Sequence, residues 1–182
     1  MRLFVALDLP AALKADLGRL KLDIRYATWV RPGTHHLTLR FLGGAVDEQA
    51  VPRLADALSA ITVPPFDLTV QGVGRFPPSE KKAARVLWAG TAPSPALFDL
   101  HGAVAHAAQQ AGFPLDGTPY HPHITLARLK SFKADPRVET FLNEYATFRA
   151  EPFRADSFVL FSSALTPQGA QYTPLHTFPL KG

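Results

Sequence analysis

Two short runs of the sequence place a histidine and a threonine two residues apart. Residues 36–39 read His-Leu-Thr-Leu, and residues 123–126 read His-Ile-Thr-Leu. Polar and apolar residues alternate in both runs, as they do in a half-buried β-strand, and residues i and i+2 of a strand share one face. We therefore expect two strands that each present an imidazole beside a hydroxyl on one face and bury two apolar side chains on the other.

Two facing imidazoles of this kind predict acid–base chemistry at a phosphate. Neutral imidazole is the side chain best suited to proton transfer near pH 7, so His36 and His123 could act as acid and base on opposite sides of a bound group. The hydroxyls of Thr38 and Thr125 could donate hydrogen bonds to an oxyanion held between them. A strained 2′,3′-cyclic phosphate suits this arrangement, because its leaving group needs no metal ion.

Two other interpretations of these runs remain. A single strand histidine is more often a buried residue satisfied by its neighbours, and it is the recurrence of the run that favours a site. His121 lies two residues before His123, which is also the spacing of a His-x-His metal pair. Because no Asp or Glu lies near either run to complete such a pair, the sequence predicts no metal ion and no cofactor.

The elements that would position the two runs form two similar halves. Local patterns predict strands near 3–7, 36–42, 66–70, 85–89, 123–129, 153–161 and 171–178, and helices near 10–22, 47–61, 94–112 and 135–145. The distance from Leu3 to His36 is 33 residues, and that from Arg85 to His123 is 38. The sequence therefore predicts an α+β fold with two antiparallel-rich sheets facing a central cleft and helices outside. Residues 1–182 would form one domain of two pseudo-symmetric lobes, with the turn-rich loop 74–82 as the boundary.

Composition sets further limits. With 47% hydrophobic residues, a chain of 182 residues can bury a sizeable core. The net charge of +4 and sequence pI of about 9.6 permit an anionic ligand such as an RNA end. The absence of Cys excludes disulfides and thiolate catalysis. No apolar run approaches the roughly 20 residues of a membrane span, and the first one breaks at Asp8, too early for a signal peptide. We expect a cytoplasmic monomer.

With these flanks, the two runs resemble those of the 2H phosphoesterases, and more closely those of the RNA 2′,3′-cyclic phosphodiesterases, also called 2′-5′ RNA ligases. The resemblance covers residues 2–7, Trp29, 36–43, Phe76, 85–90 and 121–128. It implies hydrolysis of RNA 2′,3′-cyclic phosphate ends, such as those of tRNA halves, to 2′-phosphomonoesters. It also implies weak, reversible, ATP-independent 2′-5′ joining. The site residues that it implies are His36 as proton donor, His123 as proton acceptor, and Thr38, Thr125 and Arg128 as phosphate contacts.

Strand alternation conflicts with the resemblance at Arg128. This residue lies five positions after His123, so regular alternation would send it to the opposite face. It can reach the phosphate only if the strand ends or bulges near Ala127. On the first strand, Arg40 has the parity of His36 and is the alternative cation. The aromatic residues that could stack on a terminal base are Phe41, Phe76, Tyr120 and Trp29, although core packing is the more common role for each.

Two alternative functions use the same cleft. One is a phosphodiesterase for a small cyclic phosphate, for example one derived from ADP-ribose. The other is a module that binds RNA ends without turnover. Metal-free turnover of a dinucleotide-length RNA with a cyclic phosphate end distinguishes all three.

Overall fold

The two runs belong to different sheets, which meet at the centre of the molecule. The computed structural model describes Met1 to Gly182 and has the α+β class that the sequence predicts. The first run begins β3 (His36–Gly43), in a sheet of order β10-β9-β1-β3 whose other strands are β1 (Arg2–Asp8), β9 (Ser157–Thr166) and β10 (Gly169–Pro179). The second run lies at the start of β7 (Ile124–Leu129), in a sheet of order β2-β7-β6-β5 whose other strands are β2 (Ala27–Trp29), β5 (Val70–Phe76) and β6 (Val86–Thr91). All paired strands are antiparallel, and β3 and β7 approach each other.

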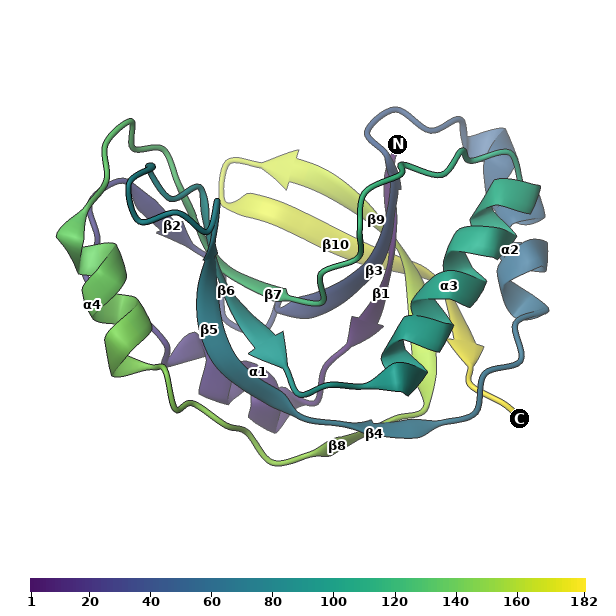
Figure 1. Ribbon diagram of the computed structural model, residues 1–182. Coiled ribbons are helices and arrows are strands. Elements are labelled where there is room, and N and C mark those ends of the chain that lie inside the picture. Colours follow the sequence, from purple (N-terminus) through teal and green to yellow (C-terminus); the bar gives the residue numbers. More distant parts are fainter.

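Helices flank the two sheets (Figure 1). The α-helices are α1 (Ala11–Gly18), α2 (Val51–Ser59), α3 (Pro95–Gln110) and α4 (Pro136–Glu144), and a short 3-10 helix, η1 (Glu48–Ala50), precedes α2. In Figure 1, α2 and α3 lie together at the side of the first sheet, whereas α4 lies at the far side of the second. Residues 47, 94 and 135, where three of the helices were expected to begin, act as N-caps: the side chains of Asp47, Ser94 and Asp135 each accept a hydrogen bond from a backbone N–H in the first turn.

The strands do not divide between the sheets at the expected boundary. Residues 77–85 form the connection between β5 and β6, which pair in one sheet, so the loop 74–82 is part of a hairpin and not a division between lobes. The final strands β9 and β10 join the sheet of β1. Residues 27–29, for which no strand was predicted, pair with β7 as β2. The small strands β4 (Phe66–Leu68) and β8 (Phe153–Ala155) pair separately and divide two of the expected strands.

The apolar faces of the two motif strands meet in one core. Leu37, Leu39, Ile124 and Leu126 are each at most 2% exposed and belong to the same cluster of 39 buried hydrophobic residues. This confirms the predicted side-chain alternation, because the intervening histidines and threonines are only partly buried. The opposite, polar faces of β3 and β7 are thereby left for a common cleft.

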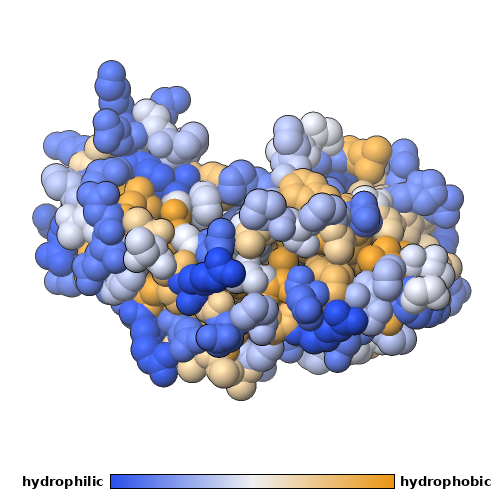
Figure 2. Space-filling model, turned by 60° about the horizontal axis from the view of Figure 1, so that its bottom comes forward, coloured by the Kyte–Doolittle hydropathy of each residue, from blue (hydrophilic) through white to orange (hydrophobic).

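The surface is largely polar. Hydrophilic residues predominate on the face shown in Figure 2, and hydrophobic residues form patches between them. Every helix falls short of the length and apolar character that a membrane crossing requires.

The contact between β5 and β6 generates a stability prediction. A Cβ atom at Gly74 would lie 2.1 Å from Cζ2 of Trp88, so Gly74→Ala must displace the indole ring. We expect a loss of about 1–3 kcal/mol in the free energy of unfolding, the usual cost of overpacking. Urea denaturation followed by circular dichroism measures it. The control is Gly102→Ala within α3, where a Cβ meets no atom within 4 Å and alanine should raise stability by up to about 1 kcal/mol. Equal stability of Gly74→Ala and the wild type would contradict the packing argument.

Candidate active site

One cavity contains the five residues that the sequence singles out. His36, Thr38, His123, Thr125 and Arg128 all line a cleft of about 540 Å³ between the two sheets. β3 supplies the first pair and β7 supplies Thr125 and Arg128, while His123 immediately precedes β7. The tertiary structure therefore brings together two half-sites that lie 87 residues apart in the sequence.

Both imidazoles are held in the same way. Nδ1 of His36 lies 3.1 Å from the carbonyl oxygen of Thr34, and Nδ1 of His123 lies 2.7 Å from that of His121. A carbonyl can only accept, so each Nδ1 carries a proton and donates it to the backbone two residues earlier. In the neutral ring, Nε2 is then the unprotonated nitrogen. Each half-site thus offers one Nε2 for proton transfer.

Burial lowers the pKa of both imidazoles below the usual 6.5. For His36, desolvation is the largest cause, and it outweighs the opposing effects of the Thr34 carbonyl and the Asp8 carboxylate. For His123, desolvation is again the largest cause, with a further lowering by His121 and Arg128. Both rings are consequently neutral at pH 7 in the free protein and open to proton exchange with a bound ligand.

Arg128 reaches the cavity because β7 contains a bulge. Leu87 pairs with Ala127, but Trp88 pairs with Thr125, so Leu126 is an extra residue on the β7 side. Leu126 and Ala127 are both buried, at 1% and 0% exposure, and alternation resumes one position later. This bulge returns Arg128 to the face of His123 and Thr125.

The same bulge occurs in β3. Val5 pairs with Arg40 and Ala6 pairs with Thr38, which leaves Leu39 as the extra residue. As a result, Arg40 is buried on the core side at 7% exposure. It forms an ion pair with Asp116 at 2.9 Å and donates to the carbonyl of Pro114. The prediction that parity aims Arg40 at the site is wrong, because it assumed an unbroken strand.

Phe41 lies five residues after His36, just as Arg128 lies five residues after His123. Beside Phe41, the positive charge comes from another residue, Arg2. Phe41 lines the cavity, and the guanidinium of Arg2 lies 4.4 Å from the centre of its ring, within the range of a cation–π contact. Arg2 also lines the cavity from β1. Arg2 was not among the site residues predicted from the sequence, although its position at the start of a strand adjacent to a motif strand was a signal for it.

Aromatic rings support each imidazole. The Phe4 ring centre lies 4.8 Å and the Tyr172 ring centre 4.9 Å from that of His36, and both residues line the cavity. Phe76 meets the ring of His123 edge-on at 5.0 Å. Phe4 was missed because five consecutive residues of β1 are buried, and alternation then does not distinguish the cleft side from the core side. Tyr172 was missed because it lies on β10, which reaches the motif strand only through the pairing of the sheet. These rings restrict the orientations open to the imidazoles.

Tyr120 lies outside the cavity and connects the two half-sites. Its hydroxyl donates to the backbone carbonyl of Thr38 at 2.9 Å, and its ring stacks on His101 at 3.8 Å between centres. Burial raises the pKa of Tyr120, which keeps the phenol protonated as a donor. Trp29, the fourth aromatic candidate, packs against Phe141 of α4.

His121 is exposed and its ring centre lies 6.3 Å from that of His123. No group of three or more His, Asp or Glu side chains is arranged to share a metal ion. His121 and His123 therefore have no third protein side chain with which to bind a metal ion.

His35 immediately precedes β3 and, like His36, is among the residues that line the cavity. It is 3% exposed, and its Nδ1 has no hydrogen-bond partner. Burial, assisted by the charges of His36, Lys14 and Lys21, lowers the pKa of His35 to about 4.

Comparisons with known proteins identify what the chain resembles. Residues 9–166 match the model of the 2′-5′ RNA ligase superfamily. Two relatives called RNA 2′,3′-cyclic phosphodiesterase are similar over almost their whole length. The one from Archaeoglobus fulgidus is 30% identical over 98% of this chain and 99% of its own, and the one from Thermotoga maritima is 34% identical over 100% and 97%. The crystal structure of Escherichia coli LigT complexed with 3′-AMP matches with a TM-score of 0.81 and 27% identity, over 100% of this chain and 98% of that one.

The lowered pKa of His35 generates a prediction about acid stability. The native pKa of about 4 lies below the unfolded value of 6.5, so the unfolded chain takes up a proton first as the pH falls. The free energy of unfolding should therefore decrease between pH 6.5 and pH 4, with a contribution from His35 of roughly 3 kcal/mol at most. Urea denaturation across this range measures it. His35→Leu should remove that contribution, whereas His176→Leu, at an exposed position, controls for the loss of an imidazole. The same pH dependence in His35→Leu and wild type would refute the assignment.

Proposed function

Because the chain belongs to the 2′-5′ RNA ligase superfamily, we propose that it hydrolyses the 2′,3′-cyclic phosphate at the end of an RNA strand to a 2′-phosphomonoester. The relatives from Archaeoglobus and Thermotoga carry the name of this activity. The observation that carries the proposal is the pair of half-sites on one cavity, each with a histidine whose Nδ1 donates to the backbone and a threonine beside it.

The proposed reaction moves two protons in opposite directions. Nε2 of His123 takes a proton from a water molecule as its oxygen attacks phosphorus. The bond from phosphorus to the 3′ oxygen breaks, and protonated His36 gives its Nε2 proton to that oxygen. The Nδ1–H bonds to the backbone persist in both protonation states, so neither ring has to turn during the cycle. The anionic phosphate raises the pKa of His36 on binding, which supplies the acid.

The phosphate oxygens would be bound by Thr38, Thr125 and Arg128. The hydroxyls of Thr34, Thr140 and Thr166 donate to backbone carbonyls, whereas those of Thr38 and Thr125 have no partner within the protein and are free to donate to a ligand. A guanidinium complements the charge that accumulates on the non-bridging oxygens. Arg2, held over Phe41, is a second cation on the same cavity.

A 5′-hydroxyl could replace the attacking water. Deprotonation by His123 and attack on the same phosphorus would then form a 2′-5′ linkage without ATP, and the reverse step would cleave it. We include this joining as a weak second activity of the same site. RNA with a cyclic phosphate end, tRNA halves among the candidates, would be the substrate of both reactions.

One assay separates the proposal from its alternatives. A dinucleotide with a 2′,3′-cyclic phosphate end is incubated with the protein in EDTA, and the product is identified by phosphorus NMR. We expect turnover to a 2′-phosphate. Binding without turnover would indicate an end-binding module. Turnover of only small cyclic phosphates such as one derived from ADP-ribose would indicate the second enzyme class, and loss of activity in EDTA would contradict metal independence.

We predict that His36→Ala and His123→Ala each reduce hydrolysis about 10²–10⁴-fold, the usual contribution of a positioned acid or base. A substrate with sulfur in place of the 3′ bridging oxygen distinguishes the two roles, because sulfur departs without a proton. His36→Ala should be largely rescued on this substrate and His123→Ala should stay slow. Rescue of the His123 variant alone would reverse the assignment, and a 3′-phosphate product would contradict it independently.

The pH dependence of kcat/KM gives a further test of the same pair. The reaction needs neutral His123 and protonated His36, and burial lowers the pKa of both in the free enzyme. We therefore expect a bell-shaped profile with its maximum below pH 6.5 and a decline at higher pH as His36 loses its proton. On the 3′-thio substrate the alkaline decline should disappear. An optimum above pH 8 would be incompatible with these two groups.

Replacing either threonine by valine keeps the branched shape and removes only the hydroxyl. Thr38→Val and Thr125→Val should each lower kcat about 10–10³-fold if the hydroxyl donates to the phosphate in the transition state. Steady-state kinetics on the dinucleotide measures this, with Thr173→Val at an exposed position of β10 as the control. Wild-type kinetics in both site variants would leave the threonines as ordinary strand residues.

A further inference from the structure

Positive charge is concentrated in two loops next to the active site. Residues 79–85 are part of the connection between β5 and β6, and residues 128–137 run from the end of β7 into α4. Together they contain seven Lys or Arg and two Asp or Glu, a net charge of +5, whereas the whole chain of 182 residues carries only +4. The rest of the protein is thus close to neutral. We call these two segments the basic loop surface.

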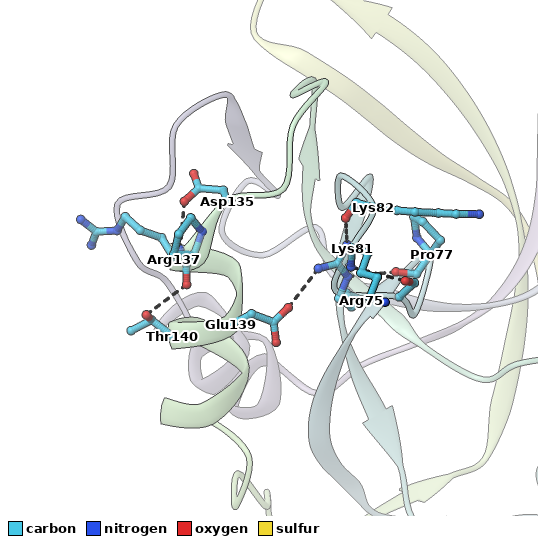
Figure 3. A network of polar contacts seen from close by, with 10 residues as sticks. Arg75, Pro77, Lys81, Lys82, Asp135, Arg137, Glu139 and Thr140 are labelled. Carbon is cyan, nitrogen blue, oxygen red and sulfur yellow. Dashed lines mark hydrogen bonds and ion pairs between the residues drawn. The ribbon is translucent and has the colours of Figure 1, made fainter.

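A buried arginine fixes the first of these loops. Arg75 is 5% exposed, and its Nε donates to the carbonyl of Pro77 at 2.9 Å. One terminal nitrogen donates to the carbonyl of Lys82, and the other lies 3.0 Å from Glu139 of α4. Figure 3 shows Arg75 between the loop and α4. The backbone of this loop is therefore held at Pro77 and Lys82 before any ligand binds, which reduces the entropy cost of binding.

The two loops enclose a hollow with an exposed aromatic ring. Lys81, Lys82, Arg85, Phe132 and Lys133 line a space of about 560 Å³. Phe132 is 90% exposed, the most exposed of the large hydrophobic side chains. The guanidinium of Arg85 lies 6.0 Å from the centre of its ring. A solvent-exposed ring among cations is the usual composition of a surface for single-stranded nucleic acid, since the cations meet phosphates and the ring stacks on a base.

This surface is continuous with the catalytic cavity. Val86, next to Arg85, pairs with Arg128, which lines the cavity. Arg128 and Lys130 are exposed and the residue between them is buried. The chain then bends at Phe132. Four residues span at most about 14 Å, so Phe132 lies within the reach of a few nucleotides from the reacting phosphate.

We propose, on the basis of the function proposed above, that the basic loop surface binds the single-stranded RNA that lies a few nucleotides 5′ of the reacting phosphate, beyond the span of a dinucleotide. A cyclic phosphate is the 3′ terminus of its strand, so the remaining RNA must leave the cavity in the 5′ direction. Lys81, Lys82 and Lys133 meet successive phosphates, and Phe132 stacks on an unpaired base. The surface sets the affinity for longer RNA, whereas the two half-sites carry out the chemistry.

The first experiment varies substrate length and surface charge together. Steady-state kinetics are measured on a cyclic-phosphate dinucleotide and on an unstructured ten-nucleotide RNA with the same end. Lys81→Ala/Lys133→Ala should raise KM for the longer RNA about 10-fold or more and leave both constants for the dinucleotide unchanged. It should also reduce the slope of log KM against log salt by about 1.4, because single strands lose roughly 0.7 per phosphate contact.

The matched control removes the same charge from another part of the surface. Arg19, which directly follows α1, and Arg154 of β8 are exposed residues that pair with Asp16 and Asp67. Both α1 and β8 lie at the bottom of Figure 1, away from the two loops. Arg19→Ala/Arg154→Ala should leave the length dependence and the salt slope unchanged.

The second experiment tests the aromatic ring. Phe132→Ala and Phe132→Leu should both raise KM for the ten-nucleotide RNA, by about 5–150-fold for one stacked base, whereas Phe132→Tyr retains the ring and should behave as wild type. Because the side chain is exposed, none of the three should alter the melting temperature. Wild-type KM in Phe132→Ala, or full function in Phe132→Leu, would refute stacking.

The failure of this proposal differs from the failure of the proposed function. Equal kcat/KM for both lengths in the wild type, or an unchanged length preference in the lysine variant, would overturn the surface proposal while leaving hydrolysis intact. If the protein hydrolyses neither RNA, the proposed function fails, and fluorescence anisotropy with the labelled ten-nucleotide RNA still tests the surface. Binding that is weakened in the lysine and Phe132→Ala variants would support it, and equal binding in all variants would overturn it.

Discussion

The geometry of the site depends on a one-residue β-bulge that interrupts both motif strands. The bulge lies between the His-x-Thr pair and the third cavity-lining residue, at Leu39 in β3 and at Leu126 in β7. Each bulge buries two consecutive residues and reverses the parity of those that follow. Without it, Arg128 would point into the core, where an unpaired guanidinium is costly. In each motif strand the bulge leaves one residue without a partner in the neighbouring strand and places a third residue on the face that lines the cleft.

A second constraint keeps the half-sites together, since they belong to different sheets. Tyr120 lies on the segment that leads into His123, yet its hydroxyl donates to the backbone carbonyl of Thr38, which belongs to the half-site on β3. His101 of α3 bonds to the carbonyl of Leu39 and stacks on the same tyrosine. The shared hydrophobic core fixes the sheets from behind, and these bonds fix them beside the cleft. Two imidazoles can act on one phosphorus only if their separation is held constant.

The electrostatics of the cleft follow from the same arrangement. Burial lowers the pKa of both catalytic candidates, while Arg2 and Arg128 add positive charge without a carboxylate partner in the cavity lining. An anionic phosphate is the ligand that such an environment stabilises most, and its arrival favours a proton on one imidazole. The contrast with Arg40 and Arg75 is informative. Those two guanidiniums are buried, whereas Arg2 and Arg128 are exposed, and each of the buried pair is matched with a carboxylate and serves the fold.

The sequence by itself determined the elements that depend on local pattern. Alternation in 36–39 and 123–126 predicted which residues face the cleft, and the caps at Ser94 and Asp135 predicted the starts of α3 and α4. The tertiary structure decided whatever depends on a partner strand. A bulge exists only relative to the neighbouring strand, so no pattern within β3 or β7 could reveal that Arg128 enters the cavity and Arg40 leaves it. Contacts between distant parts of the chain likewise decided that residues 27–29 form β2 and that Arg2 lies over the ring of Phe41. A local sequence pattern cannot reveal such contacts, because it contains no information about which distant segment will lie beside it.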